Sequence, residues 1–224
     1  MSEALTWVRA PYPVPFAAQV ASPDLAETIF SGQMRAEDDP NWAASGAETP
    51  QEYAYWTERA CGVACVKMCV EALGGPQRPL VAWAKAGVAA GGYLTELRAD
   101  GSQNERGWLH SGLAGLIASA GFYAQPRPAE LNEFPALLAA GRLLIASVSY
   151  QIGTALPVTN RGGHLTVISA AGLRGETLAA LEVYNPSGRG KALREAAVIP
   201  VDRFAAGYAG RIIVVGPQER AQSL

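Results

Sequence analysis

The stretch of sequence that decides the fold is RACGVACVKMCVEALGGP, which occupies residues 59–76. Apolar residues fill most positions from Cys61 to Leu73, and the following Gly74-Gly75-Pro76 cannot continue a helix. We therefore expect a buried helix over residues 61–73 that begins at Cys61.

The three cysteines of the chain, Cys61, Cys65 and Cys69, all lie in this stretch. Unpaired N–H groups at a helix N-terminus favour a thiolate, and the effect fades within the first turn. We therefore expect a lowered pKa and a nucleophilic role for Cys61, with a buried structural cysteine as its alternative. Cys65 and Cys69 are expected to be small buried residues. A zinc site is disfavoured, because no second pair of closely spaced cysteines is present.

We expect mainly helices in the part of the chain before about residue 141 and mainly strands after it. Further helices are predicted at 22–30, 49–59, 79–89, 111–120 and 130–140, with a polar loop at 31–48 and a long Gly-rich loop at 91–108. Strands rich in Val, Ile and Leu are predicted at 143–150, 164–171, 178–184, 196–201 and 211–215. This order predicts an α+β fold in which a helical half packs on an antiparallel sheet.

Composition limits the function classes. With 224 residues, 49% hydrophobic content and a net charge of -2, the chain suits one globular domain over residues 1–224. The sequence has no block of basic residues, so we do not expect it to bind nucleic acid. It also has no apolar run long enough to cross a bilayer. The N-terminus has Glu3 and several prolines where a signal peptide would be apolar, so we expect a cytoplasmic protein. Oligomeric state is left open.

A base for Cys61 must come from one of two histidines. His164 follows Arg161-Gly162-Gly163 and begins a predicted strand, so its ring can face a cleft while its backbone is fixed. Asn185 ends the next strand and could orient that ring, although Asn-Pro also starts ordinary turns. His110, just before a predicted helix, is the competing base. The order Cys61, His164, Asn185 is that of papain-like enzymes.

These segments resemble one family of papain-like cysteine peptidases, the bacteriocin double-glycine-leader peptidases. The resemblance is carried by residues 59–68, by Gly163-His164-Leu165-Thr166-Val167-Ile168, by Tyr184-Asn185-Pro186 and by the Gly-Trp-Leu-His-Ser-Gly-Leu segment at 107–113. It implies a papain-like fold with no cofactor and no metal. Members of this family typically have Asp where this chain has Asn185, and papain-like enzymes at large use Asn.

The resemblance also implies an oxyanion-hole glutamine. Such a glutamine usually precedes the cysteine by a few residues, and this chain has Tyr55 and Trp56 there. Gln19, in Pro13-Val14-Pro15-Phe16-Ala17-Ala18-Gln19, resembles the proline-aromatic-Gln lead-in of the family. Residues 22–58 would then be an insertion between the glutamine and the nucleophile helix.

The resulting hypothesis is a cysteine peptidase that hydrolyses peptide or small amide substrates through a thioester. Cys61, His164, Asn185 and Gln19 are its expected catalytic residues, and Gly62, Gly163, Trp108 and His110 are expected to contact substrate. Gly62 would leave room for a substrate carbonyl beside the backbone. Two alternatives stay open: a cysteine acyltransferase or amidase acting on a non-peptide substrate, and a catalytically silent papain-like binding module.

Overall fold

The computed structural model describes residues 4–97 and 103–218. Within these residues, seven antiparallel strands form the main sheet in the order β4-β9-β5-β6-β7-β8, and β1 pairs with the second half of β6. The strands are β1 (Thr6–Arg9), β4 (Phe122–Pro128), β5 (Leu143–Val148), β6 (His164–Arg174), β7 (Thr177–Tyr184), β8 (Ala197–Pro200) and β9 (Tyr208–Pro217).

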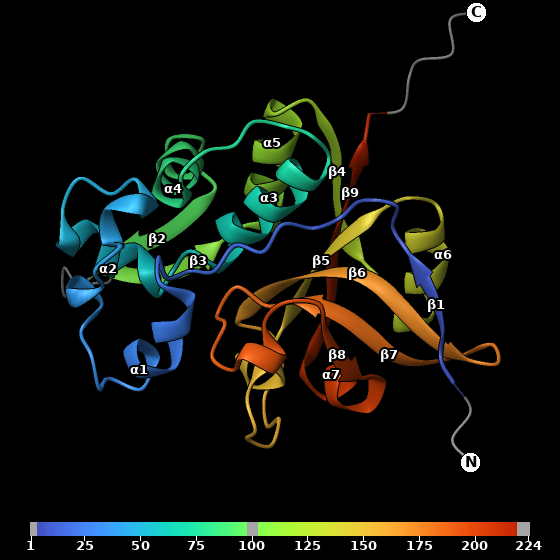
Figure 1. Cartoon of the computed structure of the whole chain (residues 1–224). Helices are drawn as coiled ribbons and strands as arrows, with labels where there is room; N and C mark the ends of the chain where they lie inside the picture. The colour runs from blue at the N-terminus through green and yellow to red at the C-terminus, as the bar shows by residue number, and fades with distance from the viewer. Residues whose placement is uncertain (1–3, 98–102, 219–224) are drawn as a thin grey trace, which may run out of the picture.

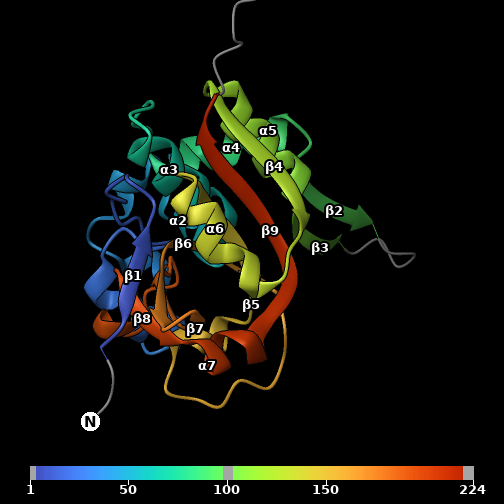
Figure 2. The same cartoon turned by 90° about the vertical axis from the view of Figure 1, so that its right-hand side faces the viewer.

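Helices cover the sheet unevenly. Figure 1 shows α2 to α5 gathered beside the sheet, with α3 and α6 on opposite sides of β5 and β6. Figure 2 shows α6 in front of the sheet. The helices are α1 (Ala26–Phe30), α2 (Pro50–Thr57), α3 (Cys61–Ala72), α4 (Leu80–Ala89), α5 (His110–Ser119), α6 (Phe134–Ala139) and α7 (Val201–Gly207).

Helix α3 lies at the centre of the core. It packs on β6 and against α4 and α5. Side chains on nearly every side of it are inaccessible to solvent, among them Val63, Cys65, Met68 and Cys69. Burial of this kind holds the first turn of α3 in a fixed position against the start of β6. No described helix is both long and apolar enough to traverse a lipid bilayer.

The α+β class and most predicted elements are confirmed. The helix predicted at 61–73 is α3, and the five predicted strands are β5, β6, β7, β8 and β9. Thr49 caps α2 as expected, since its side chain accepts a hydrogen bond from the N–H of Glu52 at 3.1 Å. The loop predicted at 31–48 contains two short 3-10 turns, Ala36–Asp38 and Trp42–Ser45.

The prediction of a long loop at 91–108 was wrong. Strands β2 (Tyr93–Leu97) and β3 (Gln103–Trp108) pair there, while 98–102 lie outside the described residues. The glycines of this segment are explained by local structure. Gly107 has a φ of 85° and lies where the register of the strand pair shifts. Gly112 packs against Gly92, and a Cβ on Gly112 would be 2.3 Å from the Gly92 Cα. Glycine thus permits a bulge and a close backbone approach.

Besides β2 and β3, three further described elements were not predicted: β1, β4 and α7. β4 contains Pro126 and Pro128, which are unusual inside a sheet, and β4 is the edge strand beside β9. A proline at an edge removes no ladder hydrogen bond if its nitrogen faces outward. Helix α7 follows β8 without a loop, so its start carries no separate signal.

Residues 22–58 form a largely helical segment that returns to its starting point. A second, smaller hydrophobic cluster joins Ala26 and Ile29 of this segment to Val20, which precedes it. Buried Asp39 ties the segment together, because it accepts hydrogen bonds from Ser22 Oγ at 2.5 Å and Tyr53 Oη at 2.6 Å. Figure 1 shows this part of the chain, which includes α1 and α2, at the left of the view, with the main sheet to its right.

Candidate active site

Cys61 is the first residue of α3, and it is the partly exposed member of the three cysteines. Its neighbours on the helix, Cys65 and Cys69, are fully buried, as expected. Cys61 lines a cavity of about 380 Å³ together with His164, Leu165 and Trp108. Of the three thiols, that of Cys61 is therefore the one that a substrate can reach.

His164 begins β6 directly after Gly162 and Gly163, whose φ angles are 74° and 85°. These left-handed conformations suit glycine and turn the chain sharply into the strand. The imidazole is buried, and its Nε2 lies 2.8 Å from Asn185 Oδ1. His164 lines the same cavity as Cys61, which brings together two residues that are distant in the sequence.

The hydrogen bonds around Asn185 fix the tautomer of His164. Asn185 Oδ1 also accepts from the backbone N–H of Ser187 at 3.1 Å, so this atom must be the oxygen of the amide. An oxygen acceptor requires that His164 Nε2 carries the hydrogen. In the neutral ring Nδ1 is then the free acceptor, which is the state that a general base needs.

Asn185 is held firmly by its surroundings. Its backbone N–H donates to Arg194 O at 2.7 Å, and its side chain is buried. The Nδ2 group has no hydrogen-bond partner within the described residues and lies against Gly153. A Cβ at position 153 would be 1.9 Å from Nδ2, so a glycine is needed there for Asn185 to fit.

The expected lowering of the Cys61 pKa is not found. Burial raises the pKa of Cys61 to about 11, and the backbone hydrogen bonds from Leu165 and Gly62 only partly oppose it. Burial also lowers the pKa of His164 to about 4, against the hydrogen bond with Asn185, which raises it. Desolvation therefore outweighs the N-terminus of α3, and both groups are uncharged at neutral pH.

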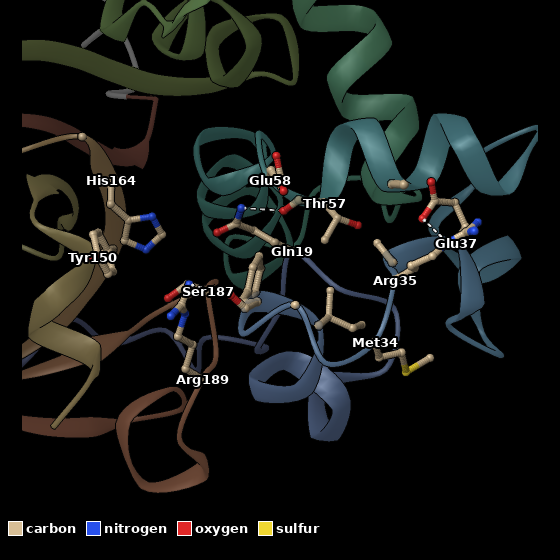
Figure 3. A pocket seen from close by; sticks show the side chains of 16 residues that line it. Gln19, Met34, Arg35, Glu37, Thr57, Glu58, Tyr150, His164, Ser187 and Arg189 are labelled. Atoms are coloured by element: carbon tan, nitrogen blue, oxygen red, sulfur yellow. Dashed lines mark hydrogen bonds and ion pairs between the residues drawn. The ribbon is translucent and has the colours of Figure 1, made fainter. Parts of the chain in front are cut away.

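Gln19 lies in a second cavity, of about 640 Å³, which His164 also lines. The side chain of Gln19 is buried, and its Nε2 donates to Thr57 O at 2.9 Å. Its backbone N–H donates to Pro186 O at 2.8 Å, next to Asn185. Figure 3 shows Gln19 between the wall that carries His164 and the wall that carries Arg35. One hydrogen of the Nε2 group is used by Thr57, which leaves the other for a ligand.

Three of the four expected substrate contacts line the cavity of Cys61: Gly163, Trp108 and His110. Trp108 also has a structural role, because its Nε1 donates to Arg59 O at 2.7 Å and its ring stacks on Trp56. The pKa of His110, at the start of α5, is lowered by burial and by the nearby charge of Arg211.

Gly62 has a packing reason that differs from the expected one. It is buried, and a Cβ there would be 2.9 Å from both the Trp108 ring and Leu113 Cδ1. The missing side chain thus makes room for Trp108. A contact between the Gly62 backbone and substrate stays a prediction.

Sequence reasoning missed several residues around the second cavity, notably Tyr150, Ser187, Arg189 and the residues of α1 and the turn after it. The Gly-rich Ser187-Gly188-Arg189-Gly190 immediately follows Asn185-Pro186, and this proximity was the one available signal for Arg189. Among the residues that the structure describes, no three His, Cys, Asp or Glu side chains gather as metal ligands would.

Comparison with solved structures gives neighbours that include peptidase domains of transporters. No protein-family model and no curated protein sequence matches the chain. The peptidase domain of Streptococcus ComA, a bi-functional ABC transporter of a quorum sensing pathway, is 15% identical with a TM-score of 0.49, over 71% of this chain and 93% of that one.

Two further structures are similar to the same extent. A double glycine motif protease from an AMS/PCAT transporter, in complex with the leader peptide, is 16% identical with a TM-score of 0.47, over 97% of this chain and 100% of that one. The N-terminal peptidase-like domain of a toxin secretion ATP-binding protein from Vibrio parahaemolyticus is 19% identical with a TM-score of 0.45, over 71% and 98%. This similarity concerns the course of the chain, and the roles proposed below depend on the geometry of the site.

Proposed function

We propose that this protein is a cysteine peptidase that hydrolyses peptide bonds through an acyl-enzyme on Cys61. The observation that carries the proposal is the bond between His164 Nε2 and Asn185 Oδ1. This bond leaves Nδ1 as the basic atom of a ring that lines the same cavity as Cys61. A thiol, an oriented base and its orienting amide are the parts that acyl transfer requires.

The proposed reaction starts from an uncharged pair. Cys61 Sγ attacks the carbonyl carbon while its proton passes to His164 Nδ1, and Asn185 Oδ1 stabilises the imidazolium that forms. His164 then gives the proton to the leaving nitrogen, the C–N bond breaks and a thioester remains. Water, deprotonated by Nδ1, attacks the thioester, and the acid product and the thiol are released.

The oxyanion would be held by two N–H groups. The backbone N–H of Cys61 lies in the first turn of α3, where no intrahelical acceptor exists. Gln19 Nε2 would supply the second donor with the hydrogen that Thr57 does not use. Replacing Gln19 with Ala should reduce kcat by about 10²–10³, as for other oxyanion donors.

Residues 22–58 remain, in this proposal, an insertion between Gln19 and α3. The support is that the two ends of this segment meet: Gln19 is hydrogen-bonded to Thr57 O, and the N–H of Ala21 donates to Tyr53 Oη at 2.8 Å. An excursion that returns to its start can be longer or shorter without moving Gln19.

The test is hydrolysis of a proteome-derived peptide library, with new termini identified by mass spectrometry. We expect cleavage by the purified protein and a loss of at least about 10³-fold in Cys61→Ala and His164→Ala. Cys69→Ala is the matched control, since it removes a buried thiol from the same helix. Equal cleavage by the Cys61→Ala variant would contradict the proposal.

Two other outcomes would replace the proposal. A covalent acyl group on Cys61 without any peptide cleavage would indicate an acyltransferase or amidase with a non-peptide substrate. Equal, slow alkylation of Cys61, Cys65 and Cys69 by iodoacetamide in the folded protein, with no acyl-enzyme, would indicate a silent binding module.

A further inference from the structure

The cavity of about 640 Å³ beside His164 has two walls from distant parts of the chain. Figure 3 shows His164, Tyr150, Ser187 and Arg189 on one side and Met34, Arg35 and Glu37 on the other. This cavity and the smaller one of Cys61 share Glu58, Gly163 and His164. The two cavities therefore form one cleft, with His164 between its halves.

The proposed chemistry determines which fragment of the substrate each half of the cleft binds. After attack the acyl group is bonded to Cys61 Sγ, so it must lie in the cavity that Cys61 lines. The leaving nitrogen must reach His164 to receive its proton, and the remaining space beside His164 is the larger cavity. The larger cavity is thus the side of the leaving fragment.

Among the described residues that line this cavity, Arg189 is the cation without a carboxylate partner. Its guanidinium lies 5.2 Å from the ring centroid of Phe30 and 5.5 Å from that of Tyr150, and it donates one long bond, of 3.5 Å, to Phe30 O. Within the described residues no carboxylate lies within 4.0 Å of it. Most of its N–H donors are therefore open, and a guanidinium pairs best with a carboxylate.

The other charges of the cavity are neutralised by neighbours. Arg35 Nε lies 3.6 Å from Glu37 Oε2, and Glu58 Oε2 lies 3.7 Å from Arg59. Arg189 is half-buried between two aromatic rings, which hold it in place and limit its exposure to water. A fixed, partly desolvated cation is the arrangement that favours an anionic group on a ligand.

We propose that the larger cavity binds the leaving fragment of the substrate and that Arg189 there pairs with a carboxylate. The substrate class is then a peptide with an acidic residue just beyond the scissile bond, on the side released first. This inference rests on the proposed peptidase function.

The test uses the reverse of the first step, so no natural substrate is needed. The p-nitrophenyl ester of N-acetylglycine, which has a small acyl group, would acylate Cys61 and release p-nitrophenolate. Added glutamic acid α-amide (Glu amide) or glutamine α-amide (Gln amide) then competes with water for the thioester: its α-amine bonds to the acyl carbon, and its proton returns to the thiol through His164. The two amides match in size and differ by one carboxylate.

We expect Glu amide to capture the acyl group about tenfold more efficiently than Gln amide, the effect of one charge-assisted hydrogen-bonded pair. Arg189→Gln should reduce this ratio to about one, and Arg189→Lys should restore part of it. Arg35→Gln is the matched control on the opposite wall and should keep the full ratio.

Each failure has a distinct meaning. Equal capture of both amides by acylated wild-type protein would overturn the role of Arg189 and leave the peptidase proposal standing. A preference lost in Arg35→Gln instead of Arg189→Gln would also overturn it. Absence of acylation at Cys61 in the wild type would contradict the peptidase function itself. The wild-type ratio decides the question even if Arg189→Gln does not fold.

Discussion

The two nitrogens of the His164 imidazole have different roles. Nε2 is held by a hydrogen bond, and Nδ1 is left to accept a proton in the proposed reaction. Nε2 is occupied by Asn185, whose oxygen also accepts two bonds from Ser187. The ring is buried, the hydrogen bond to the neutral oxygen of Asn185 favours an imidazolium, and the nearby charge of Arg189 opposes it. The uncharged state is therefore favoured at rest, and charge would develop only during reaction.

This leads to a pH prediction. Burial lowers the pKa of His164 to about 4, and proton transfer from Cys61 needs the unprotonated ring. We expect kcat/KM to rise as pH increases through about 4, and to stay level up to the pKa of Cys61, about 11. Steady-state kinetics in a series of buffers measures this profile. Re-assay at neutral pH after acid exposure is the control, and an acidic limb at 6.5, the ordinary histidine value, would contradict the prediction.

Gly153 gives a second prediction for the same pair. A methyl group at position 153 would be 1.9 Å from Asn185 Nδ2, so Gly153→Ala must displace Asn185 and release the ring of His164. We expect kcat to fall by about 10²-fold with little change in KM. Because the Asn185 bond raises the pKa of His164, its loss should also move the acidic limb to lower pH.

The matched control is Gly190→Ala, where the nearest atom to a new Cβ is 3.7 Å away. This variant should keep the activity of the wild type. Unchanged kcat in Gly153→Ala would mean that Asn185 does not act through the geometry described.

At the level of elements, the contact between α3 and Trp108 fixes the position of the first turn of α3. Gly62→Ala would put a methyl group 2.9 Å from the Trp108 ring and from Leu113 Cδ1. We expect this overpacking to reduce the free energy of unfolding by about 1–3 kcal/mol. Chemical denaturation monitored by tryptophan fluorescence measures it.

Gly115→Ala is the control for that variant. Gly115 lies in α5, and nothing is within 4 Å of a Cβ built there. A helical Gly→Ala change without a clash should raise the free energy of unfolding by about 0.5–1 kcal/mol. A Gly62→Ala variant as stable as Gly115→Ala would contradict the packing argument.

Some elements could be predicted from the sequence because their signals are local. α3 and the strands from β5 onward have continuous apolar runs with Gly or Pro at their ends. β4 and the β2–β3 pair could not, because their prolines and glycines signal loops unless the neighbouring strand or helix is known. Whether a strand lies at a sheet edge, or two backbones approach closely, is decided by the tertiary structure.

At the scale of the whole molecule, Asp39 is the residue that unites the segment 22–58. Burial acts to raise its pKa, but hydrogen bonds from Ser22, Tyr53 and Asn41 lower it overall. We expect Asp39→Ala to reduce the free energy of unfolding by at least about 2 kcal/mol, because buried donors lose their acceptor. Urea denaturation at neutral pH measures this.

The pH dependence of that effect has a definite sign. A lowered pKa contributes stability that is present above the unfolded value of 3.8 and is lost as pH falls through the folded value. The difference between wild type and Asp39→Ala should therefore shrink in acid. Asp38→Ala, which removes an exposed neighbouring carboxylate, is the control and should differ from wild type by less than about 1 kcal/mol.

The sequence predicted part of the candidate site. Cys61, His164 and Asn185 each adjoin the end of a predicted helix or strand, so their order alone indicated a common cleft. The wall that carries Arg189 and Tyr150 could not be predicted, since it forms only when loops after β5 and β7 meet α1. The prediction of a lowered pKa for Cys61 was wrong, because burial raises this pKa and burial depends on the whole fold.

The order of strands has a consequence for synthesis of the protein on the ribosome. β9, the last of the described strands in sequence order, lies inside the sheet between β4 and β5. Until residue 217 has emerged, the strands on either side of it have open edges that can pair with other chains. The sheet that presents His164 therefore cannot be completed before β9 has been synthesised, and until then the nascent chain is exposed to pairing with other chains.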